Sequence, residues 1–169
     1  MKKKLLQIGI EVNSNSTGRI AEQIGLVAMK NGFESYITFA RDYNPSQSVV
    51  IKIGSAFNIS FHVLRTRLFG DHLGGSKLAT LSLIKKIKKI RPDIIHLHQL
   101  HGYYLHIPIL FNFLKSLKTP VVWTIHDNWA FTEIPFGSYP KSLFFDKSKQ
   151  NFLRKKKIFT NMTNIRLVG

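Results

Sequence analysis

The chain has 169 residues, of which 44% are apolar, and carries a formal net charge of +16. This length and composition suit one globular domain with a hydrophobic core. The absence of cysteine excludes disulfides and thiolate metal sites. No apolar run approaches the roughly 18 residues that a membrane-spanning helix needs, so we expect a cytoplasmic protein.

Short apolar runs alternate with longer amphipathic ones in the first half of the chain. The pattern predicts, in order, strand 4–12, helix 18–32, strand 33–40, strand 48–54 and helix 57–69. Ile20, Ile24, Val27 and Ala28 fall on one face of the first helix, which we expect to pack on the sheet, and Gly32 ends this helix.

The second half continues the alternation, and its clearest helix covers 76–90, with Ser76 as a candidate N-cap. The further expected elements are strand 94–99, helix 103–117, strand 120–127, a basic helix near 146–160 and strand 165–169. This order predicts an α/β fold with a Rossmann-like, mostly parallel sheet and helices on both faces. Ligands of such sheets lie beyond the carboxyl ends of the strands, so the informative residues should follow each strand.

The positive charge is concentrated in three segments, which are residues 2–4, 77–91 and 141–169. Such clusters favour a polyanion or an anionic membrane, although a merely solvated surface is the alternative. In the last segment Phe145, Phe152 and Phe159 recur every seven residues and predict an apolar stripe on the sheet. The basic side chains expected to remain in solvent are Lys147, Lys149, Arg154, Lys155 and Lys157.

A small, polar turn, "NSNSTGRIAEQ", follows the first strand. Gly18 is expected to open the next helix, with Thr17 or Ser16 as its cap. A helix N-terminus offers free backbone N–H groups to a phosphate or carboxylate, and Arg19 could add a charged fork. The turn has neither a dinucleotide-binding nor a P-loop pattern, and a plain cap without ligand is the alternative.

Four of the seven histidines lie in "IIHLHQLHGYYLHI", residues 94–107. His96 and His98 alternate with apolar residues and therefore share one face of a strand. Two such histidines can bind zinc only with further ligands, for which His101 is one candidate; no metal-binding spacing supports this, and we predict no metal. We expect His96 to be a hydrogen-bonded core residue and His106 to be structural within the next helix.

The fifth strand ends in "WTIHDNWAFTEIP". His126 and Asp127 leave the sheet at its carboxyl edge, and Asp127 can orient His126 or cap the next segment. An imidazole here can hydrogen-bond a sugar hydroxyl, and the aromatic faces of Trp129 and Phe131 suit sugar rings. The alternative is a loop anchored by buried tryptophans.

Together these stretches resemble the N-terminal half of bacterial family 4 glycosyltransferases, which have the GT-B architecture. The resemblance is carried by "STGRIAEQIGLVAMKNGFESYI", "TRLFGDHLGGSKLAT", "IKKIRPDIIHLHQLHGYYLHI", "PVVWTIHDNWAFT" and "YPKSLFFDKSKQNF". It implies transfer of a sugar, with retention, from a nucleotide-sugar donor to a glycan or lipid-linked acceptor in capsule or other surface polysaccharide synthesis. It implies no cofactor.

The resemblance also implies roles for individual residues. His126 is expected to be catalytic by reaching the transferred sugar. The residues expected to approach the donor phosphate are Thr17, Gly18 and Arg19, and those expected to line the acceptor site are His98, His101, Gly102, Asp127 and Trp129. Residues 1–169 are expected to form the acceptor-side domain, with the C-terminal nucleotide-sugar domain absent from the chain and the chain alone inactive.

The charge leaves an alternative function, a basic α/β module that binds nucleic acid or an anionic surface without catalysis. Nucleic-acid binding would favour aromatic residues interleaved with the basic ones. Here the basic clusters lie on helices with separate apolar faces, so we expect no nucleic-acid partner and instead contact with the anionic inner face of the cytoplasmic membrane.

Overall fold

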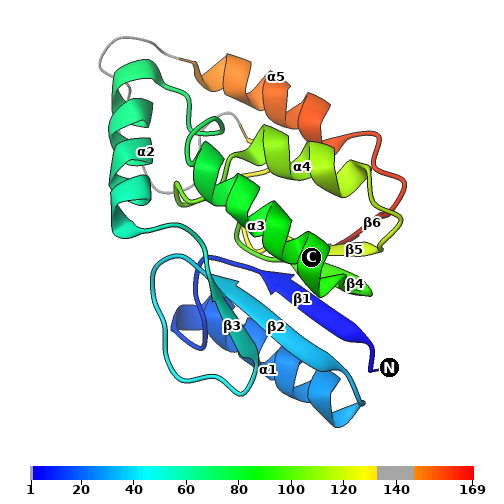
Figure 1. The fold of residues 1–169 in the computed structure, drawn as a ribbon. Coiled ribbons are helices and arrows are strands. Elements are labelled where there is room, and N and C mark those ends of the chain that lie inside the picture. Colours follow the sequence, from blue (N-terminus) through cyan, green and yellow to red (C-terminus); the bar gives the residue numbers. More distant parts are fainter. Residues whose placement is uncertain (1, 133–146) are drawn as a thin grey trace.

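Residues 2–132 and 147–169, the part of the chain that the computed structural model describes, form a six-stranded parallel sheet of order β3-β2-β1-β4-β5-β6 (Figure 1). The strands are β1 (Lys4–Ile8), β2 (Glu34–Phe39), β3 (Val49–Lys52), β4 (Ile94–Leu97), β5 (Val121–Thr124) and β6 (Ile165–Val168). The Rossmann-like α/β fold that the alternation of strands and helices in the sequence predicted is thereby confirmed.

The helices cover both faces of this sheet, as expected. They are α1 (Asn15–Lys30), α2 (Ala56–Phe69), α3 (Lys77–Ile90), α4 (Ile107–Lys115) and α5 (Ser148–Phe159). Figure 1 shows α1 on one face, α3, α4 and α5 on the other, and α2 beside α3 at the margin of the molecule. Right-handed crossovers produce this division because the chain moves outward from β1 first in one direction and then in the other.

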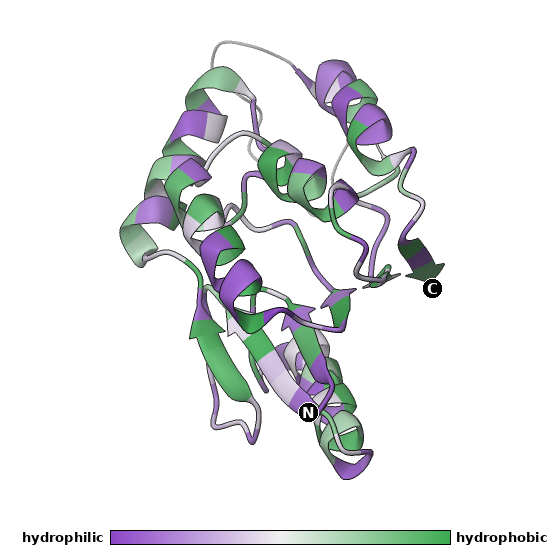
Figure 2. Ribbon diagram, turned by 45° about the vertical axis from the view of Figure 1, so that its right-hand side comes forward, coloured by the Kyte–Doolittle hydropathy of each residue, from purple (hydrophilic) through white to green (hydrophobic). Residues whose placement is uncertain are grey.

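The main hydrophobic core lies between the sheet and the helices of the α3 side. Leu6 and Ile8 of β1, Leu97 of β4 and Phe111 of α4 are completely buried in it. The strands are mainly apolar in Figure 2, whereas α5 is mainly hydrophilic. A smaller cluster of Val12, Ala21 and Ile37 lies on the α1 side. Burial on both faces explains the nearly continuous apolar strands of the sequence.

Helix α1 packs on the sheet through a different face from the one expected. Its buried residues are Gly18, Ala21, Glu22 and Gly25. Ile20 and Val27, which were expected to be buried, are 39% and 59% exposed. Short side chains let the helix approach the sheet closely, since a Cβ on Gly25 would lie 2.7 Å from the hydroxyl oxygen of Ser48.

The helix caps agree only partly with the sequence. Ser14, rather than Ser16 or Thr17, occupies the N-cap position of α1, which begins three residues before Gly18. Ser76 stands at the N-cap of α3, but its hydroxyl donates to the carbonyl of Tyr103 instead of capping the helix. His106 precedes α4 rather than lying within it, and its Nδ1 accepts a hydrogen bond from the Ile109 amide.

Helix α5 contradicts one expectation about charge. Phe159 packs on Phe111 and Trp123, as an apolar stripe would, while Phe145 lies outside the described residues. Lys155, however, is completely buried. It follows Phe152 by three residues and precedes Phe159 by four, so it lies on the same helical face. Its ammonium group donates to the carbonyls of Trp129 and Thr132 at 2.5 and 2.7 Å.

Candidate active site at the carboxyl ends of the strands

Polar side chains from four strand ends gather at the carboxyl edge of the sheet. Glu11 follows β1 and Asp42 follows β2, and the amide of Asn15 donates to both carboxylates, at 3.0 and 3.4 Å. The residues contributed from the ends of β4 and β5 are His98, Gln99, His101, His126 and Asp127. This edge includes the β1/β4 boundary, where the direction of the strand order reverses and ligands of such sheets bind.

A pair of histidines joins β4 to β5. The Nδ1 atom of His98 lies 3.2 Å from Nε2 of His126, and the two rings are stacked at 5.5 Å. His98 is 1% exposed and stacks in turn on His96, which bonds to the Thr124 hydroxyl. His96 is therefore the hydrogen-bonded core residue that was expected, and His98 lies beneath His126.

These imidazoles are electrically neutral near pH 7. Burial lowers the pKa of His98 to about 3 and that of His96 to about 4, with neighbouring histidines adding to the effect. Burial also lowers the pKa of His126, against the opposing effect of Asp127. An uncharged imidazole can accept a hydrogen bond from a hydroxyl, which is the chemistry a sugar ligand requires.

A second pair consists of His101 and Asp127. Nε2 of His101 lies 2.6 Å from one carboxylate oxygen of Asp127, and the other oxygen accepts a hydrogen bond from the Trp129 amide. Asp127 therefore caps the following turn and orients His101 rather than His126. Because a carboxylate only accepts, Nε2 of His101 donates to Asp127.

A cavity of about 10 Å³, room for about one water molecule, lies between these two pairs, and its lining includes His98, His101, His126 and Trp129. Trp129 is 3% exposed, and its indole N–H has no hydrogen-bond partner within the described residues. The aromatic ring is thus held below the histidines as part of the floor of the site.

The close approach of the backbone at Gly102 completes the β4 side. Gly102 has a φ of 118°, and a Cβ there would lie 2.3 Å from the side chain of Ile10. Its carbonyl accepts a hydrogen bond from Arg41 at 3.1 Å. The glycine therefore permits the turn that presents His101, whereas the assignment of Gly102, His98 and Trp129 to acceptor binding remains a prediction.

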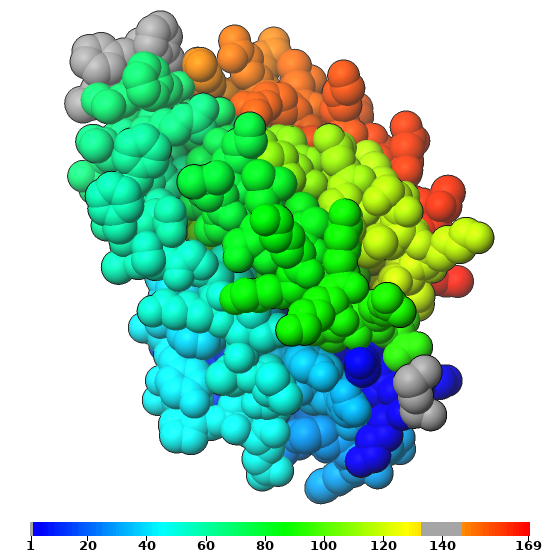
Figure 3. All heavy atoms as spheres, in the orientation of Figure 1, coloured from blue at the N-terminus to red at the C-terminus, as the bar shows by residue number. Residues whose placement is uncertain are grey.

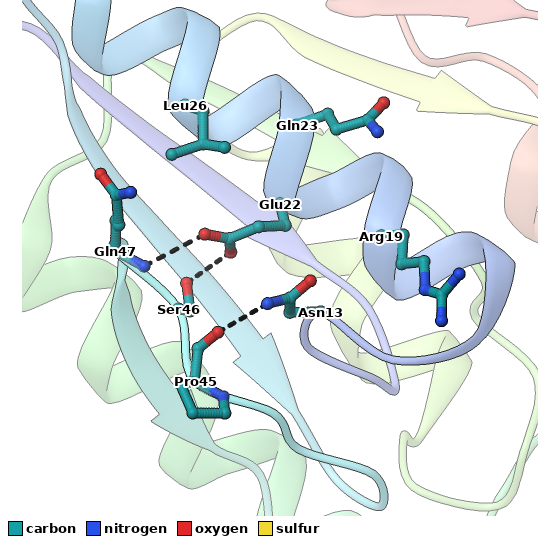
Figure 4. Close-up of a pocket in the computed structure, with 8 residues that line it drawn as sticks. All are labelled: Asn13, Arg19, Glu22, Gln23, Leu26, Pro45, Ser46 and Gln47. Atoms are coloured by element: carbon teal, nitrogen blue, oxygen red, sulfur yellow. Dashed lines mark hydrogen bonds between the residues drawn. The ribbon is translucent and has the colours of Figure 1, made fainter.

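The residues expected to approach a donor phosphate lie in the first turns of α1. Gly18 is buried, and a Cβ there would come within 3.2 Å of Glu11 and Asn13. Arg19 is exposed and lines an open pocket of about 430 Å³ together with Glu22, Ser46 and Gln47 (Figure 4). Phosphate binding by Thr17, Gly18 and Arg19 remains a prediction.

Acidic groups lie at the carboxyl edge of the sheet. The carboxylates Glu11, Asp42 and Asp127 all follow strand ends, although the whole chain carries +16. Burial, followed by the repulsion of Asp42, raises the pKa of Glu11. Across the described residues, no group of three or more His, Cys, Asp or Glu side chains is arranged to hold a metal ion.

Two residues of this region were missed by sequence reasoning. Gln7, completely buried in β1, accepts a hydrogen bond from His98 through its amide oxygen and donates to the carbonyl of Ala21 through its amide nitrogen. Its signal was a lone polar residue inside an apolar strand. Lys155 supports the Trp129 segment from α5, and its signal was its spacing of three and four residues from Phe152 and Phe159.

A second surface lies on the outer faces of α2 and α3, which stand side by side in Figure 3. We call it the outer helical face and define it by Phe57, Phe61, Leu64, Leu78 and the four lysines 85, 86, 88 and 89 of α3. Phe57 is 77% exposed and Phe61 is 57% exposed, while α2 buries the polar His62 and Thr66. In the described part of the chain no helix is long and apolar enough to cross a membrane.

The fold defines an α/β protein whose candidate site lies at the carboxyl ends of parallel strands. The profile of Glycosyltransferase Family 4 matches residues 19–162, so the chain belongs to this family. The family indicated by the sequence motifs is thereby confirmed.

The chain is also similar to individual proteins. WcaC of Escherichia coli (strain K12), a putative colanic acid biosynthesis glycosyl transferase, is 24% identical in an alignment of 140 residues that covers 76% of this chain and 34% of the relative. The chain thus spans about a third of that relative's length. The C-terminal domain of the coenzyme A biosynthesis bifunctional protein CoaBC matches with a TM-score of 0.44 and 12% identity over 77% of this chain and 66% of that one, and this likeness carries no argument.

Proposed function

We propose that the chain is the acceptor-side half of a retaining glycosyltransferase, which transfers a sugar from a nucleotide donor to a glycan or lipid-linked acceptor in surface polysaccharide synthesis. Membership of the family and the name of the colanic acid relative support a glycosyltransferase role. The observation that carries the proposal is the convergence of His101 and His126, from neighbouring strands, on one cavity at the carboxyl edge.

In this proposal the two imidazoles have different tasks. His126, held by a neutral histidine, accepts a hydrogen bond from a hydroxyl of the transferred sugar. His101, held by Asp127, binds the acceptor hydroxyl. Thr17, Gly18 and Arg19 approach the donor phosphate, and the remaining donor contacts belong to a second domain outside residues 1–169.

The test is transfer by the 169-residue chain alone and by the full-length protein, using the same nucleotide-sugars. We expect no turnover by the chain alone, because the charge of a leaving diphosphate needs positioned donors beyond those of the α1 turn. Turnover by this chain would contradict the division of labour. Full-length protein without any transferase activity would contradict the proposed function itself.

We further propose that the outer helical face adheres reversibly to an anionic bilayer, which would bring the enzyme to lipid-linked acceptors. The specific observation is the exposure of Phe57, Phe61 and Leu64 on one side of α2, a helix that lies beside α3 and its exposed lysines. Aromatic rings can enter the headgroup region while each basic residue near the surface adds about 1 kcal/mol of attraction, screened by salt.

Vesicle flotation tests this second proposal. Binding to anionic vesicles should weaken with salt, should be absent with neutral vesicles, and should fall when lysines 85, 86, 88 and 89 are changed to glutamate. The matched control changes Lys2, Lys3, Lys30 and Lys118 to glutamate, because these four exposed lysines lie outside α2 and α3 and both variants then lose the same charge. If both variants lose the same amount of vesicle binding, the net charge of the chain and not the outer helical face explains the binding.

A further inference from the structure

A line of buried polar side chains connects α1 to the edge of the site. The side-chain amide nitrogen of Gln7 donates to the carbonyl of Ala21 at 2.8 Å. The amide oxygen of Gln7 lies 3.0 Å from Nε2 of His98, whose Nδ1 lies 3.2 Å from Nε2 of His126. Gln7 and His98 are 0% and 1% exposed, so water does not compete for these bonds.

The positions of the protons along this line follow from one end. A backbone carbonyl only accepts, so the nitrogen of the Gln7 amide must face Ala21 and the oxygen must face His98. That oxygen also only accepts, and therefore Nε2 of His98 carries a proton. His98 is neutral because burial lowers its pKa to about 3, which leaves its Nδ1 without a proton.

We infer that Gln7 and His98 fix the tautomer of His126, so that Nε2 of His126 carries the proton and Nδ1 is presented to the ligand as a hydrogen-bond acceptor. Nε2–H of His126 is engaged by His98, and within the described residues no hydrogen bond is made to Nδ1. Gln7 and His98 are positioning residues, since they act through His126.

The consequence for the substrate rests on the proposed function. An acceptor nitrogen recognises a sugar position that carries a hydroxyl, which donates, and it loses that bond when the hydroxyl is replaced by hydrogen or an ether. Because the bonded Nε2 proton is directed at His98, the ring is not a proton donor toward the ligand. The tautomer itself is independent of any turnover and can be measured in the chain as it stands.

The experiment is nitrogen-15 NMR of the histidine side chains at neutral pH, in the wild-type chain and in Gln7→Met. In the wild type we expect a protonated Nε2 and an unprotonated Nδ1 for both His98 and His126. Gln7→Met removes the oxygen that holds the His98 proton, so both rings should shift toward a mixture of tautomers. The control, Thr38→Val, removes a buried hydrogen-bonding group that binds Gly9 of the same chain segment but is not part of the line, and should leave both rings unchanged.

Each outcome bears on the inference. Unchanged His126 nitrogen shifts in a folded Gln7→Met would overturn it, as would a protonated Nδ1 on either ring in the wild type. The wild-type spectrum alone decides the matter if Gln7→Met does not fold. The wild-type full-length enzyme should prefer the normal donor over a deoxy donor that lacks the recognised hydroxyl, and His126→Ala should abolish this preference. If the tautomers are as expected but His126→Ala keeps the preference, the proposed function is contradicted and the inference about the tautomer still holds.

Discussion

At the carboxyl edge of the sheet His98, His101, His126 and Asp127 all have defined hydrogen-bond partners, whereas on the outer helical face Phe57 and Phe61 extend into solvent. The first arrangement fixes direction and protonation before a ligand arrives, as recognition of one sugar geometry requires. The exposed aromatic side chains of the outer helical face have no such fixed direction, which suits contact with a fluid lipid surface. The two regions should therefore separate by mutation, with turnover depending on one and adhesion on the other.

The largest expected effect is on turnover. In the full-length enzyme His126→Ala should lower kcat by about 100- to 1,000-fold, since one positioned hydrogen-bond group can contribute about 2.7–4 kcal/mol. Steady-state kinetics measures the loss, and vesicle binding should be unchanged. His106→Ala is the matched control, because His106 caps α4 and is not among the residues that line the cavity, so its loss should affect stability more than kcat. Unchanged kcat in a folded His126→Ala would return His126 to a structural role.

Acid should weaken the edge by charging its neutral histidines. The folded-state pKa of His96 is about 4, below its usual 6.5, so the unfolded chain binds more protons between these values and stability falls as pH falls. From pH 7 to 5 His96 alone should cost about 2 kcal/mol. Urea unfolding at both pH values measures this, and His96→Gln should reduce the pH dependence by that amount. An equal pH dependence in wild type and variant would contradict the buried neutral state.

A smaller effect on catalysis should come from Asp127→Asn. The amide oxygen can still accept from the Trp129 amide, so the turn is kept, while the charge that orients His101 is lost. A hydrogen bond to a charged group is worth about 1.5–3 kcal/mol, so we expect roughly a tenfold or greater fall in kcat/KM for the acceptor. The KM for the donor should change little. A change in the donor KM alone would contradict a role of Asp127 in binding the acceptor.

The smallest expected effect concerns the outer helical face. Phe61→Ser should weaken binding to anionic vesicles about fivefold, because a partly inserted ring contributes on the order of 1 kcal/mol. Val27→Ser is the matched control, since Val27 is 59% exposed on α1, on the other side of the sheet. Kinetics with a soluble acceptor should be unaffected by either change, and equal losses of binding would contradict a defined adhesive face.

The sequence predicted the order of strands and helices because apolar periodicity reports directly on burial. It also located His126 and His101 at the strand ends, since parallel strands present their carboxyl ends at one edge. It did not predict that Asp127 would bind His101 instead of its neighbour His126, or that Gln7 would meet His98, 91 residues away. Such pairings depend on strand register, which periodicity does not determine.

The packing of α1 and α5 was misjudged for a related physical reason. An apolar stripe identifies the buried face only if the helix stands at the usual distance from the sheet, and the glycines of α1 shorten that distance. Lys155 was expected in solvent because it was counted among the basic residues that lie off the stripe of phenylalanines, and lysines seldom lie buried. Its two carbonyl acceptors and the Trp129 ring, 5.1 Å away, come from a segment whose position no local pattern reveals.

The burial of Lys155 makes its chemical modification a measure of local opening. Lys156 and Lys157, its neighbours on α5, are exposed, so an amine-reactive reagent can modify them at any moment. The same reagent reaches Lys155 only when α5 separates from the turn that carries Trp129. The lag of Lys155 behind its neighbours, followed by mass spectrometry of the modified peptides, therefore measures how often this side of the site opens.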